Sequence, residues 1–395
     1  MGKWEMVRLG DVCEVINGYA FQSSNYVSDG VRVIRITNVQ KGKIVDDDPK
    51  FYASDNSLKR YLLQANDLLV SLTGNVGRVG LFPNHMLPAY LNQRVACIRE
   101  KKFKQTNRRY LFYCLHADVF ERACIDSSKG LAQKNMSTEW LKDYEIPLPP
   151  LPTQQKIADI LDRASALIEK RKAQIAKLDL LVKSQFATMF GKGQFPLVRL
   201  EDICGFITKG TTPPTSRIGS TMTETSIPYV KVYNLSDNGE LLFHEKPQYI
   251  DIDTHKSLLA RSKVLPNDVL MNIVGLPLGK FALVTDEFAE WNINQAVAIF
   301  RSTEKVLPSY LMYAMMQPYV LRPFLDMAVG IRQINLSLKQ CRELEIPLPP
   351  LDLQRRFADF VRTAGQSKAG MQRGLDKLEL LYKSLMQKCF GGEMY

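Results

Sequence analysis

Glycine turns that carry arginine, lysine or amide side chains are the parts of this sequence with the clearest chemical meaning. The turn from Thr73 to Arg78 (TGNVGR) sets two glycines beside an arginine. Glycine lets backbone N–H groups approach a phosphate closely, and arginine can form a bidentate pair with a phosphate or with guanine. Asn and Gln side chains can form a similar bidentate pair with adenine. These residue types predict recognition of nucleic acid rather than a covalent reaction.

Residues of the same types occur at expected strand ends and in expected loops along the whole sequence. In the first part of the chain the candidate DNA contacts are Tyr19, Arg35, Asn38, Gly74, Asn75, Arg78, Arg94, Lys129, Gln133 and Lys134. In the later part they are Lys209, Thr211, Thr212, Lys231, Tyr233, Asn234, Lys280, Arg332 and Gln333. For each of them the alternative is a solvated surface residue or one that only shapes a turn.

The motifs that catalysis would need are missing from the sequence. Adenine methylation requires an Asn/Asp-Pro-Pro-Tyr/Phe loop, but the Pro-Pro pairs here are followed by Leu or Thr. The segment from Gly275 to Phe281 (GLPLGKF) is one residue short of a phosphate-binding loop and lacks the hydroxyl residue after Lys280, so we expect a turn between strands, with Lys280 near DNA. The four histidines stand apart and have no metal-ligand spacing. We expect no catalytic residue, no metal site and no cofactor in this chain.

Composition agrees with a soluble DNA-binding protein of two or three domains. The chain has 395 residues, 45% of them hydrophobic and 24% charged, with a formal net charge of +11. This charge favours a polyanionic partner, with nucleic acid ahead of a membrane surface. The seven cysteines are scattered, which fits a reducing cytoplasm better than a disulfide framework. We expect no secretory signal, because the first residues, 1–12, carry four charged side chains and no apolar segment. We expect no membrane-spanning helix, because the most apolar stretch, 269–284, is broken by polar residues and a proline.

A tandem duplication organises these features. The heptapeptide EIPLPPL at Glu145–Leu151 recurs letter for letter at Glu345–Leu351, and matches continue downstream to Phe190 and Phe390. Upstream the anchors Asn66–Asp67 and Asn267–Asp268 correspond, as do other short pairs, while the residues between the anchors differ freely. The chain is therefore two copies of about 200 residues that keep a common framework and have diverged inside it.

Each copy has two parts of different character. The first part is rich in short β-type runs, such as 31–36, 67–72, 227–232 and 281–284, with helical stretches near 108–122 and 308–324. The second part has apolar residues at alternating steps of four and three, from Ile157 to Met189 and from Phe357 to Cys389. This heptad spacing predicts a long helix with a narrow seam for another helix. Arg171, Gln185 and Lys368 are polar positions in the two seams.

These patterns predict an α+β protein with four segments. Two recognition domains at 1–150 and 192–350 are each followed by a long helix, at 151–191 and 351–391. We expect the two helices to pair as an antiparallel coiled coil with pseudo-two-fold symmetry. Pro149–Pro150 and Pro349–Pro350 stiffen the connection of each domain to its helix, so the paired helices would hold two binding surfaces at a fixed separation.

The order of domain, proline motif and long helix, repeated twice, resembles the specificity subunit of type I restriction–modification enzymes. The resemblance covers essentially the whole chain and is most specific in 130–151 and 330–351. The loops Asn17–Tyr19 and Thr208–Pro213 also resemble the first loops of the family's target recognition domains. The family commonly has Glu-Gln after the proline motif, whereas Thr153–Gln154 and Leu353–Gln354 stand here.

The resemblance implies a non-catalytic subunit that binds an asymmetric, two-part site on double-stranded DNA. It implies that two modification subunits, which methylate adenine with S-adenosylmethionine, dock on the outer faces of the paired helices and on the proline-rich segments that lead into them. Restriction subunits would add ATP- and Mg-dependent translocation and cleavage. Because Asn92–Gln93 recurs as Asn294–Gln295, this shared pair fits the framework better than sequence recognition; Arg78, Arg94 and the Lys209 loop are favoured.

Two other functions compete with this interpretation. A coiled-coil adaptor would use the helices to join partners and would bind no DNA. A stand-alone nuclease or methyltransferase would turn over without added subunits. DNA binding that weakens steeply with salt would distinguish a specificity subunit from an adaptor.

Overall fold

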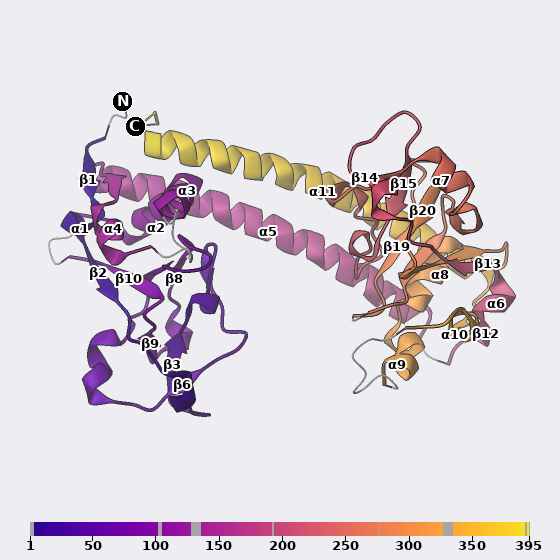
Figure 1. Ribbon diagram of the computed structural model, residues 1–395, viewed down its shortest axis with the longest axis horizontal. Coiled ribbons are helices and arrows are strands. Elements are labelled where there is room, and N and C mark those ends of the chain that lie inside the picture. Colours follow the sequence, from indigo (N-terminus) through magenta and orange to yellow (C-terminus); the bar gives the residue numbers. More distant parts are fainter. Residues whose placement is uncertain are drawn as a thin grey trace. The chain divides into compact units, whose positions relative to one another are not determined.

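The computed structural model describes residues 4–101, 105–127, 136–191, 193–275, 277–326, 335–391 and 393–394. The chain forms two compact units (Figure 1). Unit 1 contains residues 1–171 and 374–395, and unit 2 contains residues 172–373. Each long helix therefore contributes one half to each unit.

Unit 1 is built on an antiparallel sheet whose strands are not in sequence order. Its four strands run β2 (Cys13–Asn17), β10 (Val95–Glu100), β7 (Leu68–Ser71) and β8 (Val79–Leu81). A second sheet has the order β6 (Phe51–Tyr52), β3 (Val31–Ile34) and β9 (Ala89–Leu91), and in it β3 and β9 are parallel. Two short pairs complete the unit, namely β1 (Met6–Arg8) with β11 (Glu145–Pro147), and β4 (Val39–Gln40) with β5 (Lys43–Ile44).

Helices cover one face of the central sheet of unit 1. They are α1 (Leu9–Val12), α2 (Arg108–His116), α3 (Asp118–Ser127), α4 (Thr138–Asp143) and the nearby ends of α5 (Leu151–Met189) and α11 (Leu351–Gly391). The single helical stretch expected near 108–122 is in fact two helices, because Ala117 takes extended dihedrals and ends α2. The fully buried Tyr110 and Phe120 come from these two helices.

Unit 2 repeats this architecture. Its central sheet has the order β13 (Cys204–Lys209), β21 (Val297–Ser302), β18 (Val269–Asn272) and β19 (Phe281–Leu283). The second sheet is larger, with the order β14 (Ile218–Gly219), β16 (Tyr249–Ile250), β15 (Ile227–Val230), β20 (Trp291–Ile293) and β17 (Lys263–Val264). The edge pair is β12 (Leu197–Arg199) with β22 (Glu345–Pro347). The helices of unit 2 besides the two long ones are α6 (Leu200–Ile203), α7 (Ile252–Lys256), α8 (Pro308–Met315), α9 (Pro318–Asp326) and α10 (Leu338–Glu343).

The duplicated framework rests on matched polar contacts in the two cores. Arg99 donates two hydrogen bonds to Asp67 (2.8 and 2.6 Å), and Arg301 does the same to Asp268 (2.8 and 2.7 Å). The two carboxylates are almost fully buried, and a buried carboxylate is tolerated only when it is paired. The Asn that precedes each Asp has a positive φ, 64° and 69°, which asparagine adopts more readily than most residues. This explains why the Asn-Asp dipeptide survives in both copies.

The long helices have 39 and 41 residues, and their heptad pattern matches their burial. In unit 1, Ile157 and Leu161 from the start of α5 share a core with Met386 and Cys389 from the end of α11. In unit 2 the ring of Phe357, near the start of α11, lies 5.3 Å from that of Phe186, near the end of α5. The contacts within each unit thus join the start of one helix to the end of the other. A continuous coiled coil through the middle of both helices stays a prediction.

Three glycines inside α11 give a direct test of its stability. A Cβ added at Gly365 would meet nothing within 4 Å. Because glycine in a helix interior costs about 0.5–1 kcal/mol relative to alanine, we expect Gly365→Ala to raise the free energy of unfolding by about that amount. Thermal and urea unfolding would measure the change.

Gly18→Ala is the matched contrast, because a Cβ there would lie 2.2 Å from the backbone of Asn92. We expect this variant to be clearly less stable than the wild type. A Gly365→Ala protein that unfolds more easily than the wild type would contradict the assignment of this stretch as regular helix.

Candidate nucleic-acid interface

The strand ends of unit 1 meet at one edge, joined by the turn from Asn92 to Arg94. The N–H of Asn92 donates to Ile34 at the end of β3 (3.1 Å), and the N–H of Gln93 donates to Tyr19 after β2 (2.9 Å). The carbonyl of Arg94 accepts from Leu72 after β7 (2.9 Å). We call this the loop edge of unit 1: residues 18–19, 35, 60–61, 73–78 and 92–94.

Close backbone contact holds the first loop against this turn. A Cβ at Gly18 would lie 2.2 Å from both the carbonyl carbon and the oxygen of Asn92, so only glycine fits. Gly210 has the same role in unit 2, where a Cβ would lie 2.1 Å from the oxygen of Ile293. The residues that follow, Tyr19 and Thr211, are therefore placed equivalently. We define the loop edge of unit 2 as residues 209–212, 231, 261, 273–275, 277–280 and 294–296.

The predicted arginines at the loop edge of unit 1 differ in their exposure and in whether their guanidinium groups already have partners. Arg94 is exposed, and among the described residues its side chain has no partner. Arg78 is half-buried and donates to Gln40 Oε1 (2.5 Å). Arg35 pairs with Asp48 (3.2 Å), and hydrogen bonds from Lys50 and then Arg35 hold the pKa of the Asp48 carboxyl below its usual value. Arg94 is thus the most available cation of the three.

Two predicted contacts have structural roles. Asn38 is 3% exposed and Asn234 is fully buried. The amide oxygen of each accepts from the N–H three residues earlier, and the amide nitrogen of Asn38 donates to the Val45 carbonyl (2.8 Å). A base cannot reach these amides without unfolding the turn that they stabilise. Their recurrence in both copies marks a turn of the framework, and their burial in it argues against the predicted role as DNA contacts.

The predicted residues of unit 2 also lie near its loop edge. Lys209 is exposed at the end of β13, and Lys280 is partly exposed before β19. Thr211 accepts from Arg261 (3.1 Å), and Thr212 accepts from the N–H of Gln295 (3.4 Å).

The aromatic and basic pair at Lys231 and Tyr233 sits beside this edge. Lys231 Nζ lies 5.8 Å from the centre of the Tyr229 ring. Tyr233 is exposed, with Lys246 Nζ 6.0 Å from its ring centre.

In unit 1, Gly74 has a φ of 67° and Asn75 is exposed next to it.

Five of the predicted contacts lie outside the described residues: Lys129, Gln133, Lys134, Arg332 and Gln333. The described residues just after these segments are tied to the strand ends of the loop edges. The N–H of Met136 donates to Leu72 (2.8 Å), and the N–H of Leu336 donates to Ile273 (2.9 Å).

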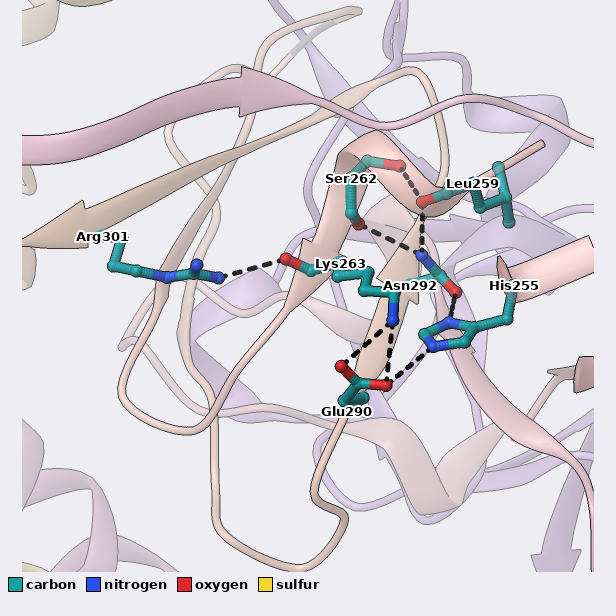
Figure 2. A network of polar contacts seen from close by, with 7 residues as sticks. All are labelled: His255, Leu259, Ser262, Lys263, Glu290, Asn292 and Arg301. Atoms are coloured by element: carbon teal, nitrogen blue, oxygen red, sulfur yellow. Dashed lines mark hydrogen bonds and ion pairs between the residues drawn. The ribbon is translucent and has the colours of Figure 1, made fainter. Parts of the chain in front are cut away.

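A buried amide network stiffens unit 2 beside its loop edge (Figure 2). Asn292 of β20 donates to the carbonyl oxygens of Leu259 and Ser262 (3.3 and 3.1 Å). Its amide oxygen lies 2.5 Å from Nδ1 of the fully buried His255. The short 3₁₀ helix Ala260–Ser262 is therefore fixed to the sheet at both of its ends.

Glu290 completes this network from the partly exposed side. His255 Nε2 lies 2.8 Å from one carboxylate oxygen, and Lys263 Nζ lies 3.2 and 3.3 Å from the two oxygens. The hydrogen bond with His255, followed by the one with Lys263, holds the pKa of the Glu290 carboxyl below its usual 4.5 against the opposing effect of partial burial. The ionised carboxylate is therefore the form that the fold stabilises.

The cysteines of the chain are structural. All seven are free and buried. Burial raises the pKa of the Cys114 thiol to about 12, and the thiols of Cys204 and Cys341 are affected similarly. A thiol in this state is a poor nucleophile and a poor metal ligand. Within the part of the chain that the structure describes, no group of three His, Cys, Asp or Glu side chains could hold a metal ion.

Two exposed arginines at the loop edges were not among the residues predicted from the sequence. Arg60 lies beside Tyr61, whose ring is 5.3 Å from that of Tyr19, and Arg261 contacts Thr211. The signal was present in the sequence: aligned on the two Asn-Asp anchors, these two arginines occupy the same position of the repeat.

These observations define a class of protein: a duplicated α+β chain with a cationic loop edge on each unit. The sequence matches the family model described as the type I restriction modification DNA specificity domain, over residues 1–178 and 194–379. The chain therefore belongs to this family. None of its described helices is both long and apolar enough to cross a membrane.

Individual relatives agree with this assignment. The chain is 25% identical to the type I restriction enzyme EcoBI specificity subunit of Escherichia coli, over 99% of this chain and 86% of that protein. It is 31% identical to the MjaVIII specificity subunit of Methanocaldococcus jannaschii over 44% of this chain and 43% of that protein. The fold is similar to that of a type I restriction–modification S subunit from M. genitalium, with a TM-score of 0.55 and 14% identity over 98% of this chain and 96% of that one. A solved structure concerned with assembly of the type I R-M system gives a TM-score of 0.59 at 20% identity, over 100% and 98% of the two chains.

The Glu290 network yields a pH-dependent prediction. Since the pKa of the folded Glu290 carboxyl is depressed, its contribution to stability is present above its ordinary value of 4.5 and is lost as pH falls through the lower folded value. We expect Glu290→Gln to lower the Tm by about 2–4 °C near neutral pH, with a difference that shrinks in acid. Thermal unfolding from pH 7 to pH 3 would measure this.

Glu287→Gln is the control, because Glu287 pairs with the exposed His244 at the surface (3.0 Å). Its Tm should change little at any of these pH values. An equal Tm loss for Glu290→Gln at all pH values would contradict the assigned carboxylate.

Proposed function

We propose that this chain is the DNA specificity subunit of a type I restriction–modification enzyme and performs no catalysis itself. Each unit contacts one part of an asymmetric two-part site on double-stranded DNA, and the long helices set the distance between the two parts. The observation that carries this proposal is a shared framework with different exposed residues at equivalent places on the two loop edges.

The differences are concrete at three positions. The first loop reads Asn17-Gly18-Tyr19 in unit 1 and Lys209-Gly210-Thr211 in unit 2. In unit 1 the carbonyl of the exposed Arg94 accepts a hydrogen bond from the N–H of Leu72. In unit 2 the equivalent bond runs from the N–H of Ile273 to Ala296, which has no cationic side chain. Base edges are recognised by such exposed side chains, while residues that differ little between the units hold the shape. Two different loop edges fit two different half-sites.

The long helices offer surfaces for the partner subunits. Leu180 and Leu181 are 64% and 49% exposed, and Leu380 and Leu381, at the matching positions of α11, are 69% and 65% exposed. Exposed leucine pairs that recur on both helices fit two equal docking places for two modification subunits. S-adenosylmethionine would be bound by these modification subunits, and ATP and Mg by the restriction subunits. With this division of labour, we propose that the protein acts on cellular DNA in the cytoplasm.

A salt titration tests the proposal as a whole. Complexes of the chain with its modification subunits should bind the DNA site with an affinity that falls steeply between 50 and 200 mM salt, as counterion release requires. Methylome sequencing of the source cell should show an adenine-methylated motif in two parts. A chain that forms no DNA complex with its partners present would instead be an adaptor.

Arg94 provides a sharper prediction about one half-site. We expect Arg94→Ala to weaken discrimination at one or two base pairs of a single half-site by about 1–3 kcal/mol, because a bidentate arginine contact is lost. The methylated motif in cells that carry the variant would measure this change. Lys209→Ala is the paired variant and should affect only the other half-site. A relaxed motif in both halves for either variant would refute the assignment of one half-site to each unit.

The leucine pairs yield a prediction about stoichiometry. The double variant Leu180→Ser with Leu181→Ser should remove one of two modification subunits, as should Leu380→Ser with Leu381→Ser, because each pair forms one docking place. Native mass spectrometry of the complexes would count the subunits. Leu197→Ser is the control, since Leu197 is similarly exposed, at 60%, but lies outside the helices. Full occupancy in both double variants would exclude these pairs as docking places.

A further inference from the structure

Arg60 and Arg261 occupy one position of the duplicated framework. The matched core arginines fix the register, because Arg99 donates to the Leu62 carbonyl (2.9 Å) and Arg301 donates to the Lys263 carbonyl (3.1 Å). Leu62 forms a β-bridge with Tyr90 of β9. Lys263, the counterpart of Leu62, pairs with Asn292 of β20, the counterpart of Tyr90. Arg60 and Arg261 each stand two residues before these anchors.

Both side chains are held at the loop edge, but by different contacts. The Arg60 guanidinium lies 4.6 Å from the centre of the Tyr61 ring, which itself packs on Tyr19 at 5.3 Å. The Arg261 guanidinium donates to the hydroxyl of Thr211 (3.1 Å). Tyr19 and Thr211 are the equivalent residues after the loop glycines. Different residues in the two units thus hold an arginine at the same position, next to the first loop of each unit.

The backbone beneath each arginine is fixed. In unit 2, Asn292 holds the carbonyls of Leu259 and Ser262 on either side of Arg261 (Figure 2). In unit 1 the Tyr90 hydroxyl contacts the backbone of Asp55 (3.2 and 3.3 Å), and Asp55 caps the 3₁₀ helix Asn56–Tyr61 that carries Arg60. Each arginine therefore projects from a short helix that is anchored to the same strand position. A positioned guanidinium loses less freedom on binding than a mobile one.

Neither arginine is neutralised by the residues that the structure describes. Both are exposed, and in the part of the chain that the structure describes neither has a carboxylate partner. By contrast, Arg32 pairs with Asp46 (2.7 Å) and Arg35 with Asp48. Arg60 and Arg261 therefore keep their full charge, unlike Arg32 and Arg35.

We propose that Arg60 and Arg261 are a matched pair of phosphate contacts, one for each half-site. Two domains that recognise different sequences share only the sugar–phosphate backbone of their targets. A cation kept at the same position in both loop edges fits that shared feature, whereas Tyr19, Arg94 and Thr211, which differ between the units, face the bases. This inference rests on the proposed function and adds to it which residues set affinity independently of sequence.

The test is a salt titration of the assembled complex with Arg60→Gln, Arg261→Gln and the double variant. Each lost phosphate contact should reduce the slope of log affinity against log salt by about 0.9, and the double variant by about twice that. Affinity should fall by the same factor for the specific site and for unrelated DNA. The methylated motif should stay unchanged.

Arg355→Gln serves as the charge-matched control, since Arg355 is an exposed arginine on α11 paired with Asp352 (2.9 Å) and lies outside both loop edges. Its slope should equal that of the wild type, and thermal unfolding of every variant confirms that it is folded. An altered motif in either half would show base recognition and overturn the proposal, as would an unchanged slope in the double variant. A wild-type complex with no salt-dependent DNA binding would refute the proposed function itself, which is a different result.

Discussion

The buried glutamine at the start of each long helix is the contact on which the arrangement of each domain on its helix depends. Gln154 and Gln354 are fully buried. The amide nitrogen of Gln154 donates to the carbonyls of Pro149 (2.8 Å) and Gln105 (3.0 Å), and its oxygen accepts from the N–H of Asn107 (2.7 Å). One side chain therefore joins the proline segment, the loop before α2 and the first turn of α5.

The second copy repeats this contact with other neighbours. Gln354 donates to Pro349 (2.9 Å) and to Lys305 (3.3 Å), and accepts from Leu307 (2.9 Å). A shorter or apolar side chain would leave two carbonyls and one N–H buried without partners, at about 1–3 kcal/mol each. This cost explains why Gln is kept when the residue before it varies between Thr153 and Leu353. The family pattern has a glutamate at the positions of Thr153 and Leu353. Its absence matters little here, because the buried hydrogen bonds are all made by the glutamine that follows.

The fold could be predicted from the sequence where both copies carry the same signal. The heptad spacing predicts the two long helices. The Asn-Asp and Pro-Pro anchors predict the duplication, since each of them meets the same structural constraint in both units. The candidate site was less predictable. Asn38 and Asn234 have the side chains that recognise adenine, but burial in a turn is a tertiary property that residue type does not reveal. Arg60 and Arg261 were missed because the offset between the two copies changes along the chain, so their equivalence is seen only when the copies are aligned on the Asn-Asp dipeptides.

The seams of the two long helices differ at one position in a way that limits how the helices can pair. Ile168 is buried in α5, whereas its counterpart in α11 is Lys368. Lys368 contacts Asp179 of α5 (2.6 Å) and Glu240 (2.7 Å). Burial alone would lower the pKa of the Lys368 ammonium, but the hydrogen bonds with Asp179 and Glu240 outweigh it and raise that pKa, so the side chain stays charged.

This ion pair disfavours one competing assembly. If α5 paired with α5 of a second chain in the same register, Asp179 would face Ile168 instead of a lysine. A half-buried carboxylate without a partner is costly, whereas the pairing of α5 with α11 satisfies it. A polar residue at a seam position is a known way to specify the partner and register of a helix pair at some cost in stability. The divergence between the copies therefore has a structural consequence at Lys368, where it makes each long helix prefer the other one, besides the role in half-site recognition that we propose for the loop edges.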